Sequence, residues 1–366
     1  MSGAGAADLL PGEGATWADC QLVAPFPYFG GKRRVAREVW RRFGDVTAYC
    51  EPFFGSGAVL LGRPSGHAGR TETVNDADGL LSNFWRAVRA DPVAVAHHAD
   101  WPVNEVDLHA RHAWLVGQRE DVTRQMEGDP DWYDARAAGW WVWGACSWIG
   151  SGWCSGRGPW KVVADADGAS KLVHLGNAGQ GVNRQLVHLS NAGGGVNRKL
   201  VHLGNAGRGA RSEYILQTMT ALAVRLRDVR VACGDWTRIV TPAVLWPTTR
   251  TGSTVTGVLL DPPYAAGERT AGLYAVEHDI SADVRDWAAA NGDNPALRIA
   301  LCGYDSQSMP DGWTAHRWKT HGGYGVGRGN QAEANSHRET VWFSPHCLAG
   351  HERRQPALFT LDDGAA

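Results

Sequence analysis

The sequence predicts an α/β protein, in which a mostly parallel sheet is interrupted by a long and largely helical insertion. Three observations support this fold class: an apolar strand that ends in the corner 261–264, a glycine-rich turn within residues 49–61, and an acid 19 residues after Gly57. Open α/β sheets bind their ligands at the carboxyl ends of strands, where all three features are expected. The sequence therefore places one binding site at one edge of the sheet.

The composition is that of an ordinary globular protein without a generally basic surface. Of the 366 residues, 43% are hydrophobic and 20% are charged, and the net charge is −2, so contact with nucleic acid requires a local basic surface. We find neither an apolar run of about 20 residues for a membrane span nor a signal-peptide pattern at residues 1–18. Seven cysteines without a Cys-x-x-Cys pair favour reduced thiols and predict no metal site.

The first element after a Gly/Ala-rich start is a turn with Gly30 and Gly31, followed by a basic helix that we expect to reach residue 43. Paired glycines let backbone amides approach a ligand, and a helix N-terminus favours a carboxylate or a phosphate. Arg34 and Arg37 fall on one face of the predicted helix. That face is either simply solvated or a surface for DNA phosphates.

The next segment predicts a strand, a turn at 55–57 with the sequence Gly-Ser-Gly, and a short helix. It resembles the nucleotide-binding turn of Rossmann-like sheets, although a third glycine is missing. A further strand ends at Asp76, and an acid at this spacing holds the ribose hydroxyls of a bound nucleoside. The alternative role for Asp76 is to cap the helix that follows.

The corner 261–264, with the sequence Asp-Pro-Pro-Tyr, follows the apolar run 258–260. Proline donates no backbone hydrogen bond and biases the residue before it toward an extended conformation, so a stiff, non-helical corner is expected. It presents one carboxylate, carbonyl groups next to prolines and one aromatic ring. This set suits a flat base with an exocyclic amine.

The insertion at 91–228 has a different character. It contains the segment from Trp101 to Trp160, which holds nine of the 18 tryptophans, and then a 14-residue unit that occurs three times within 171–212. Residues 168–211 carry six lysines and arginines and no acid. The repeat is either a tandem duplication within a surface loop or a loop that contacts DNA phosphates. The candidate contacts are Lys171, Arg184, Arg198 and Lys199.

Taken in order, the motifs resemble those of the Dam-like D12 class of DNA adenine-N6 methyltransferases. The matching segments are 28–32, 51–59, 75–76, 233–236 and 261–264. The resemblance covers roughly 25–90 and 229–345, and the insertion falls where this family carries its DNA-recognition region. Tyr28, Ser56 and Trp236 stand where the family often has Trp, Gly and Phe. The resemblance implies a catalytic domain at 21–90 and 229–347, a target-recognition region at 91–228, and flexible tails at 1–20 and 348–366.

The resemblance also implies a Rossmann-like fold that uses S-adenosylmethionine as methyl donor and double-stranded DNA as substrate, without a metal. Asp261 and the Pro262 carbonyl would accept the N6 hydrogens of a flipped-out adenine, and Tyr264 would stack on the base. The implied catalytic residues are Asp261, Pro262, Pro263 and Tyr264. The implied cofactor residues are Tyr28, Gly31, Lys32, Glu51, Phe53, Gly55, Gly57, Asp76, Asp235 and Trp236. Among these, Lys32 would lie near the methionine carboxylate, Asp76 at the ribose, and Asp235 with Trp236 at the adenine.

Three alternatives stay open from the sequence: an N4-cytosine DNA methyltransferase, an RNA or protein-glutamine methyltransferase, and a catalytically silent DNA-binding relative. The Asp form of the corner favours adenine among these. We further expect a monomer in the bacterial cytoplasm, encoded by the bacterium or by a phage.

Overall fold

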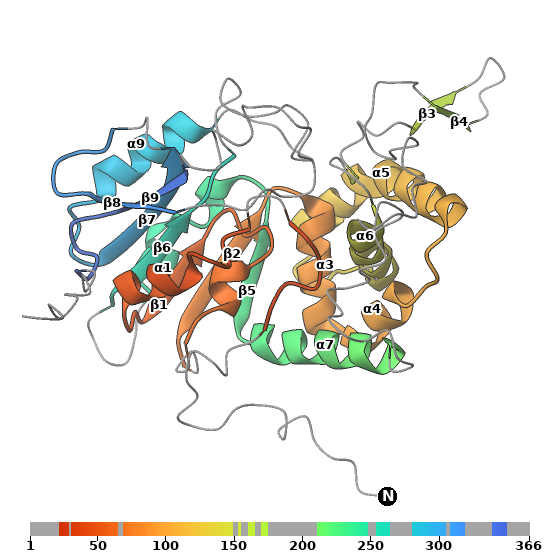
Figure 1. Ribbon diagram of the computed structural model, residues 1–366, viewed down its shortest axis with the longest axis horizontal. Coiled ribbons are helices and arrows are strands. Elements are labelled where there is room, and N and C mark those ends of the chain that lie inside the picture. Colours follow the sequence, from red (N-terminus) through yellow and green to blue (C-terminus); the bar gives the residue numbers. More distant parts are fainter. Residues whose placement is uncertain are drawn as a thin grey trace, which may run out of the picture.

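The computed structural model describes residues 22–28, 31–64, 69–148, 153–154, 160–164, 170–174, 211–247, 254–263, 280–304, 308–318 and 339–349. A sheet with flanking helices and a second group of helices lie side by side (Figure 1). Four of the predicted site residues lie outside the described part: Tyr264, Arg184, Arg198 and Lys199. Of Lys171 only the backbone is described, in a strand.

A seven-stranded mixed sheet forms the first part, in the order β5-β2-β1-β6-β7-β9-β8. The first five strands in this order are parallel, and β9 runs antiparallel to both of its neighbours. The strands are β1 (Ala48–Glu51), β2 (Thr71–Asp76), β5 (Val229–Cys233), β6 (Thr256–Leu260), β7 (Leu297–Tyr304), β8 (Thr314–Arg317) and β9 (Glu339–Phe343). This confirms the predicted α/β fold with a Rossmann-like sheet.

The order of the strands reverses at β1, because β2 and β5 follow on one side of it and β6 and β7 on the other. In open α/β sheets the ligand crevice lies outside the carboxyl ends of the strands at such a switch point. The glycine turn follows β1, and Asp261 follows β6 directly. Two motifs separated by about 200 residues of sequence therefore start from adjacent strands.

Both faces of the sheet are buried, which explains the uninterrupted apolar run of β6. Side chains alternate between the faces of a strand: Leu259 packs in the cluster with Phe43 from α1 (Ala36–Phe43), whereas Val258 and Leu260 pack with Val284 from α9 (Ser281–Asn291). The described helix α1 begins four residues later than Lys32, after a turn at 33–35. Two short helices, α2 (Ala58–Leu61) and α8 (Pro242–Leu245), complete this part.

The second part is a group of five packed helices beyond the β5 edge of the sheet (Figure 1). They are α3 (Gly79–Ala90), α4 (Pro92–Ala99), α5 (Glu105–Gly128), α6 (Ala135–Ser147) and α7 (Arg211–Leu226). Side-chain oxygens cap the first four of these helices and fix where each begins. The capping residues are Asp78, Asp91, Asn104 and Asp134.

The tryptophans of this part form much of its core, since Trp141, Trp143 and Trp148 are buried. Beyond α6, β3 (Trp160–Ala164) and β4 (Ser170–His174) pair as a separate antiparallel ribbon. No helix in the described ranges is both long and apolar enough to cross a membrane.

Candidate active site

The turn after β1 has a conformation and a packing that require glycine. Gly55 and Gly57 have φ values of +47° and +62°, a region that residues with a side chain rarely adopt. A Cβ atom at position 55 would also lie 2.6 Å from Cε1 of Tyr28. The Gly55 carbonyl accepts a hydrogen bond of 3.0 Å from Nε1 of Trp85. The turn is therefore held rigidly beneath Tyr28, with no room for a side chain of its own.

Asp76 ends β2 and reaches back to this turn. Its Oδ2 accepts a hydrogen bond of 2.9 Å from the Gly55 amide, and its Oδ1 accepts one of 2.9 Å from the Asp78 amide. Burial raises the pKa of Asp76 to about 6, although the backbone donors oppose the shift. The residue that caps α3 is Asp78, so the capping role considered for Asp76 is wrong.

Asn75 links the end of β2 to the segments that follow β1 and β5. The sequence motif 75–76 did not indicate this role. Its Nδ2 donates to the carbonyls of Pro52 at 3.1 Å and Gly234 at 2.9 Å. The backbone carbonyl of Asn75 accepts a hydrogen bond from the Phe54 amide. The side-chain Oδ1 is buried and has no hydrogen-bond partner among the described residues, so one acceptor at this edge is unsatisfied.

The loop after β5 brings an aromatic pair to the same edge. Phe53 and Trp236 lie nearly parallel, with ring centroids 6.2 Å apart and an angle of 29° between the planes. Asp235 is exposed and accepts a hydrogen bond of 2.9 Å from the Thr237 amide, which begins a 3₁₀ turn at Trp236–Arg238. The pair gives this end of the edge a flat apolar character.

Glu51 is the third carboxyl of the edge, at the end of β1. It is 3% exposed and accepts a hydrogen bond of 2.8 Å from the Tyr49 hydroxyl. Burial raises its pKa well above the usual range, and the charges of Asp261 and Asp76 raise it further. Carboxyls thus stand at or just after the ends of β1, β2 and β6, where they complement a ligand that carries positive charge and hydroxyl donors.

At the corner after β6, Lys32 forms an ion pair with Asp261, with Nζ 2.9 Å from Oδ2. Lys32 is 5% exposed, and its ammonium group lies 5.9 Å from the centroid of the Trp318 ring. Lys32, which the resemblance places near the methionine carboxylate of the cofactor, thus contacts Asp261 in the structure. Pro262 is buried and Pro263 is partly exposed.

The remaining predicted residues lie around this edge or on the surface. The amide of Gly31 donates to the carbonyl of the half-buried Tyr28 over 3.4 Å. Arg34 and Arg37 are exposed. Further along α1, Arg41 and Arg42 both pair with Glu38.

A mixed seven-stranded sheet with helices, with a glycine turn and an Asp-Pro-Pro corner at its switch point, is consistent with a Rossmann-like methyltransferase fold. Residues 28–105 match the family model of the D12 class N6 adenine-specific DNA methyltransferase. Residues 28–105 therefore carry a domain of this class, which implies an adenine-specific DNA methyltransferase with S-adenosylmethionine as the methyl donor. A comparison with curated proteins returns no match. The predicted family, reaction and cofactor are thereby confirmed.

Proposed function

We propose that the edge formed by β1, β2, β5 and β6 binds S-adenosylmethionine and that the corner 261–264 presents the N6 amine of a flipped-out adenine to it. The observation that carries this proposal is the meeting of the Asp76-held glycine turn and the Lys32-paired Asp261 at the switch point. The match to the family model ends at residue 105, so the role of Asp261 rests on this geometry and on the motif.

The residues present fit this cofactor. Asp76 and the unsatisfied Asn75 Oδ1 can accept hydrogen bonds from hydroxyl and ammonium donors, and Glu51 supplies a buried carboxyl. Phe53 and Trp236 offer flat surfaces to an adenine ring. When bound, the cofactor supplies a methyl group that its sulfonium already activates. No covalent enzyme intermediate is therefore needed.

Asp261 and its neighbour act on the acceptor amine. The lone pair of adenine N6 is delocalised into the ring, so the amine is a poor nucleophile. Asp261 accepts one N6 hydrogen and the Pro262 carbonyl accepts the other, which localises the lone pair and stabilises the positive charge that develops on N6. The base must leave the duplex to reach this corner, and Tyr264 stacks on it.

Lys32 positions the carboxylate for this step. It holds Asp261 through Oδ2, and we assign the other oxygen, Oδ1, to the base amine. We therefore assign Lys32 to the orientation of Asp261 before the base arrives.

The segment 91–228 serves as the target-recognition region in this proposal, and the substrate is double-stranded DNA bound by a monomer. Helix α5 connects this region to the catalytic edge. Arg119 of α5 pairs with Asp78 at 2.6 Å, and Glu127 lies 3.4 Å from Arg238. Contacts made by the insertion thus reach the residues next to Asp76 and Asp235.

The test of the reaction is the chemistry of the product. Mass spectrometry of nucleosides from DNA incubated with the protein and S-adenosylmethionine is expected to show N6-methyladenine. Finding N4-methylcytosine alone would assign the enzyme to the alternative base. Finding bound but unmodified DNA would leave only a binding role.

Cofactor affinity is expected to fall as the pH drops through 6. Asp76 has a pKa of about 6, and its carboxylate form is the acceptor for ribose hydroxyls, so affinity should fall about tenfold between pH 7 and pH 5. Asp76→Asn should remove this dependence. Calorimetric titration of both proteins across this range measures it, and a pH-independent wild-type affinity contradicts the role of Asp76.

The raised pKa of Asp76 also predicts how the stability of the cofactor-free protein depends on pH. Because the pKa is raised on folding, the folded state binds a proton more readily than the unfolded chain between about pH 4 and pH 6. The contribution of Asp76 to stability is therefore greatest below this window and decreases as the pH rises through it. Urea unfolding of wild type and Asp76→Asn at pH 4.5 and 7 gives the difference.

Replacing Arg34 and Arg37 together by glutamine is expected to weaken DNA binding and flatten its salt dependence. The slope of log K against log salt is about 0.9 for every phosphate that the protein neutralises, so the slope of the double variant should be smaller by nearly 2. Arg285→Gln, on α9, is the matched control for a partly exposed arginine elsewhere. An unchanged slope would show that this surface is merely solvated.

A further inference from the structure

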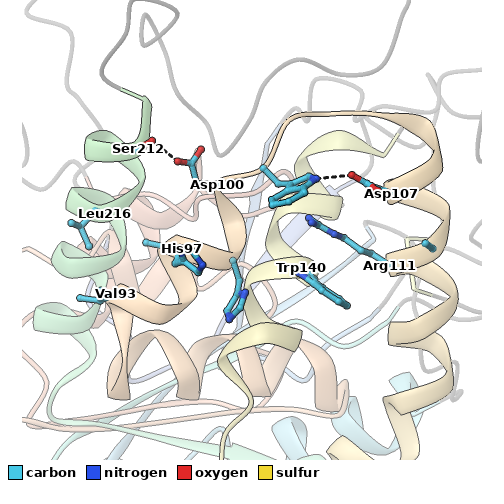
Figure 2. A pocket seen from close by; sticks show the side chains of 12 residues that line it. Val93, His97, Asp100, Asp107, Arg111, Trp140, Ser212 and Leu216 are labelled. Carbon is cyan, nitrogen blue, oxygen red and sulfur yellow. Dashed lines mark hydrogen bonds between the residues drawn. The ribbon is translucent and has the colours of Figure 1, made fainter.

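A cavity of about 780 Å³ lies within the helical part, between α4, α5, α6 and the start of α7 (Figure 2). It is remote from the catalytic edge. Arg111 lines the cavity near the beginning of α5, whereas Glu127 near the end of that helix contacts Arg238. Sixteen residues of α-helix separate them, a distance of about 24 Å. The cavity therefore cannot be the pocket for the adenine that is methylated.

Arg111 is an unusual group for such a cavity. It is 8% exposed, and three tryptophan rings surround its guanidinium, with centroids at 4.4 Å for Trp143, 4.9 Å for Trp101 and 5.0 Å for Trp140. Its Nη1 is buried without a hydrogen-bond partner among the described residues. Cation–π contacts stabilise the charge, but they leave the N–H donors unsatisfied, which is costly for a buried group. Figure 2 shows the side chain pointing into the cavity.

The charge around the cavity decides which acceptor suits Arg111. Asp100 and Asp107 line it beside this one guanidinium. Burial lowers the pKa of His98, so that ring is neutral at pH 7 and adds no positive charge. Two carboxylates against one cation disfavour a phosphate. They favour a neutral ligand that offers acceptors to Arg111 and N–H donors to a carboxylate.

The aromatic groups require this ligand to be flat. Trp101 lines the cavity and is 45% exposed, and its Nε1 donates to Asp107 Oδ2 at 2.6 Å, which fixes the ring. Trp140 lines the cavity from α6. Indole surfaces of this kind stack on nucleobases. The volume lies within the range of pockets that enclose small aromatic ligands.

We propose that this cavity is a second base-binding site, specific for guanine. Guanine presents two adjacent acceptors, O6 and N7, to the fork of an arginine, and its N1–H and N2–H₂ groups are donors for Asp100 or Asp107. Adenine places a donor next to N7 on the same edge and would oppose the guanidinium. The guanine is supplied either by an unstacked nucleotide of DNA or by a free nucleoside.

The test uses the full chain saturated with S-adenosylhomocysteine, so that no nucleoside can enter the cofactor site. Calorimetric titration is expected to show guanosine binding at least about tenfold more tightly than adenosine or cytidine. Trp101→Ala and Arg111→Lys should each weaken guanosine binding about tenfold or more. Trp246→Ala, at a tryptophan 38% exposed on the sheet part, is the control and should bind as the wild type does.

A competition experiment between guanosine and DNA identifies the source of the base. Displacement and its absence are both compatible with the proposed site. A duplex with guanine opposite an abasic position displaces guanosine if DNA supplies the base, and fails to do so if a free nucleoside does. Equal binding of all nucleosides, no binding of guanosine, displacement by inorganic phosphate, or wild-type affinity in both cavity variants would overturn the proposal. Methyl transfer measured in parallel reports separately on the catalytic edge.

Discussion

Asp261→Asn is expected to lower the rate of methyl transfer at saturating cofactor and DNA by about 10²–10³-fold, the cost of removing one preorganised electrostatic group at a reacting centre. The amide keeps the size of the carboxyl but cannot offer an anion to the N6 hydrogens. Cofactor affinity should change by less than about threefold, because Asp76 and the glycine turn are untouched. Single-turnover methylation of a DNA substrate measures the rate, and calorimetry measures the affinity.

Two further variants make this result interpretable. Asp261→Ala should abolish transfer as well, but it removes an ion pair of the buried Lys32, so its unfolding free energy must be compared with that of the wild type. Asp286→Asn, at an exposed acid of α9 whose side chain is 77% exposed, should be silent in both assays. Strong residual transfer by Asp261→Asn would mean that the carboxylate is not essential.

The meeting of the motifs at one edge of the sheet was predictable because each motif is local and its placement follows from a general rule. The strand before 261–264 is recognisable from its apolar run, and the turn at 55–57 from its glycines. Parallel strands align their carboxyl ends at one edge, so the motifs had to meet once the sheet was inferred. The family resemblance then supplied the cofactor, which the residues alone left open.

The contacts that depend on three-dimensional packing were not predictable. Lys32 and Asp261 are 229 positions apart, and their pairing depends on how the turn before α1 crosses the sheet edge. Asn75 joins the loops after β1 and β5, which requires knowing that β2 lies between them. The tryptophans of 101–160 were expected to form a core, but no periodicity indicates that three of them surround Arg111.

Gly55→Ala is expected to lower cofactor affinity by at least about tenfold and the free energy of unfolding by about 1–3 kcal/mol. Gly55 has φ +47°, and a Cβ there would lie 2.6 Å from Cε1 of Tyr28. Either Tyr28 or the turn must move, and a moved turn displaces the amide that binds Asp76. Calorimetry with S-adenosylmethionine and urea unfolding measure the two effects.

Gly69→Ala is the matched control, because Gly69 has φ +72° and a Cβ there would meet nothing within 4 Å. Only the left-handed backbone conformation should lower its free energy of unfolding, by about 1 kcal/mol. Cofactor affinity should be unchanged. The difference between the two variants therefore isolates the clash with Tyr28. Wild-type cofactor affinity in Gly55→Ala would show that this turn does not contribute to cofactor binding. A reduction of affinity confined to Gly55→Ala would instead place the backbone of the turn against the bound cofactor.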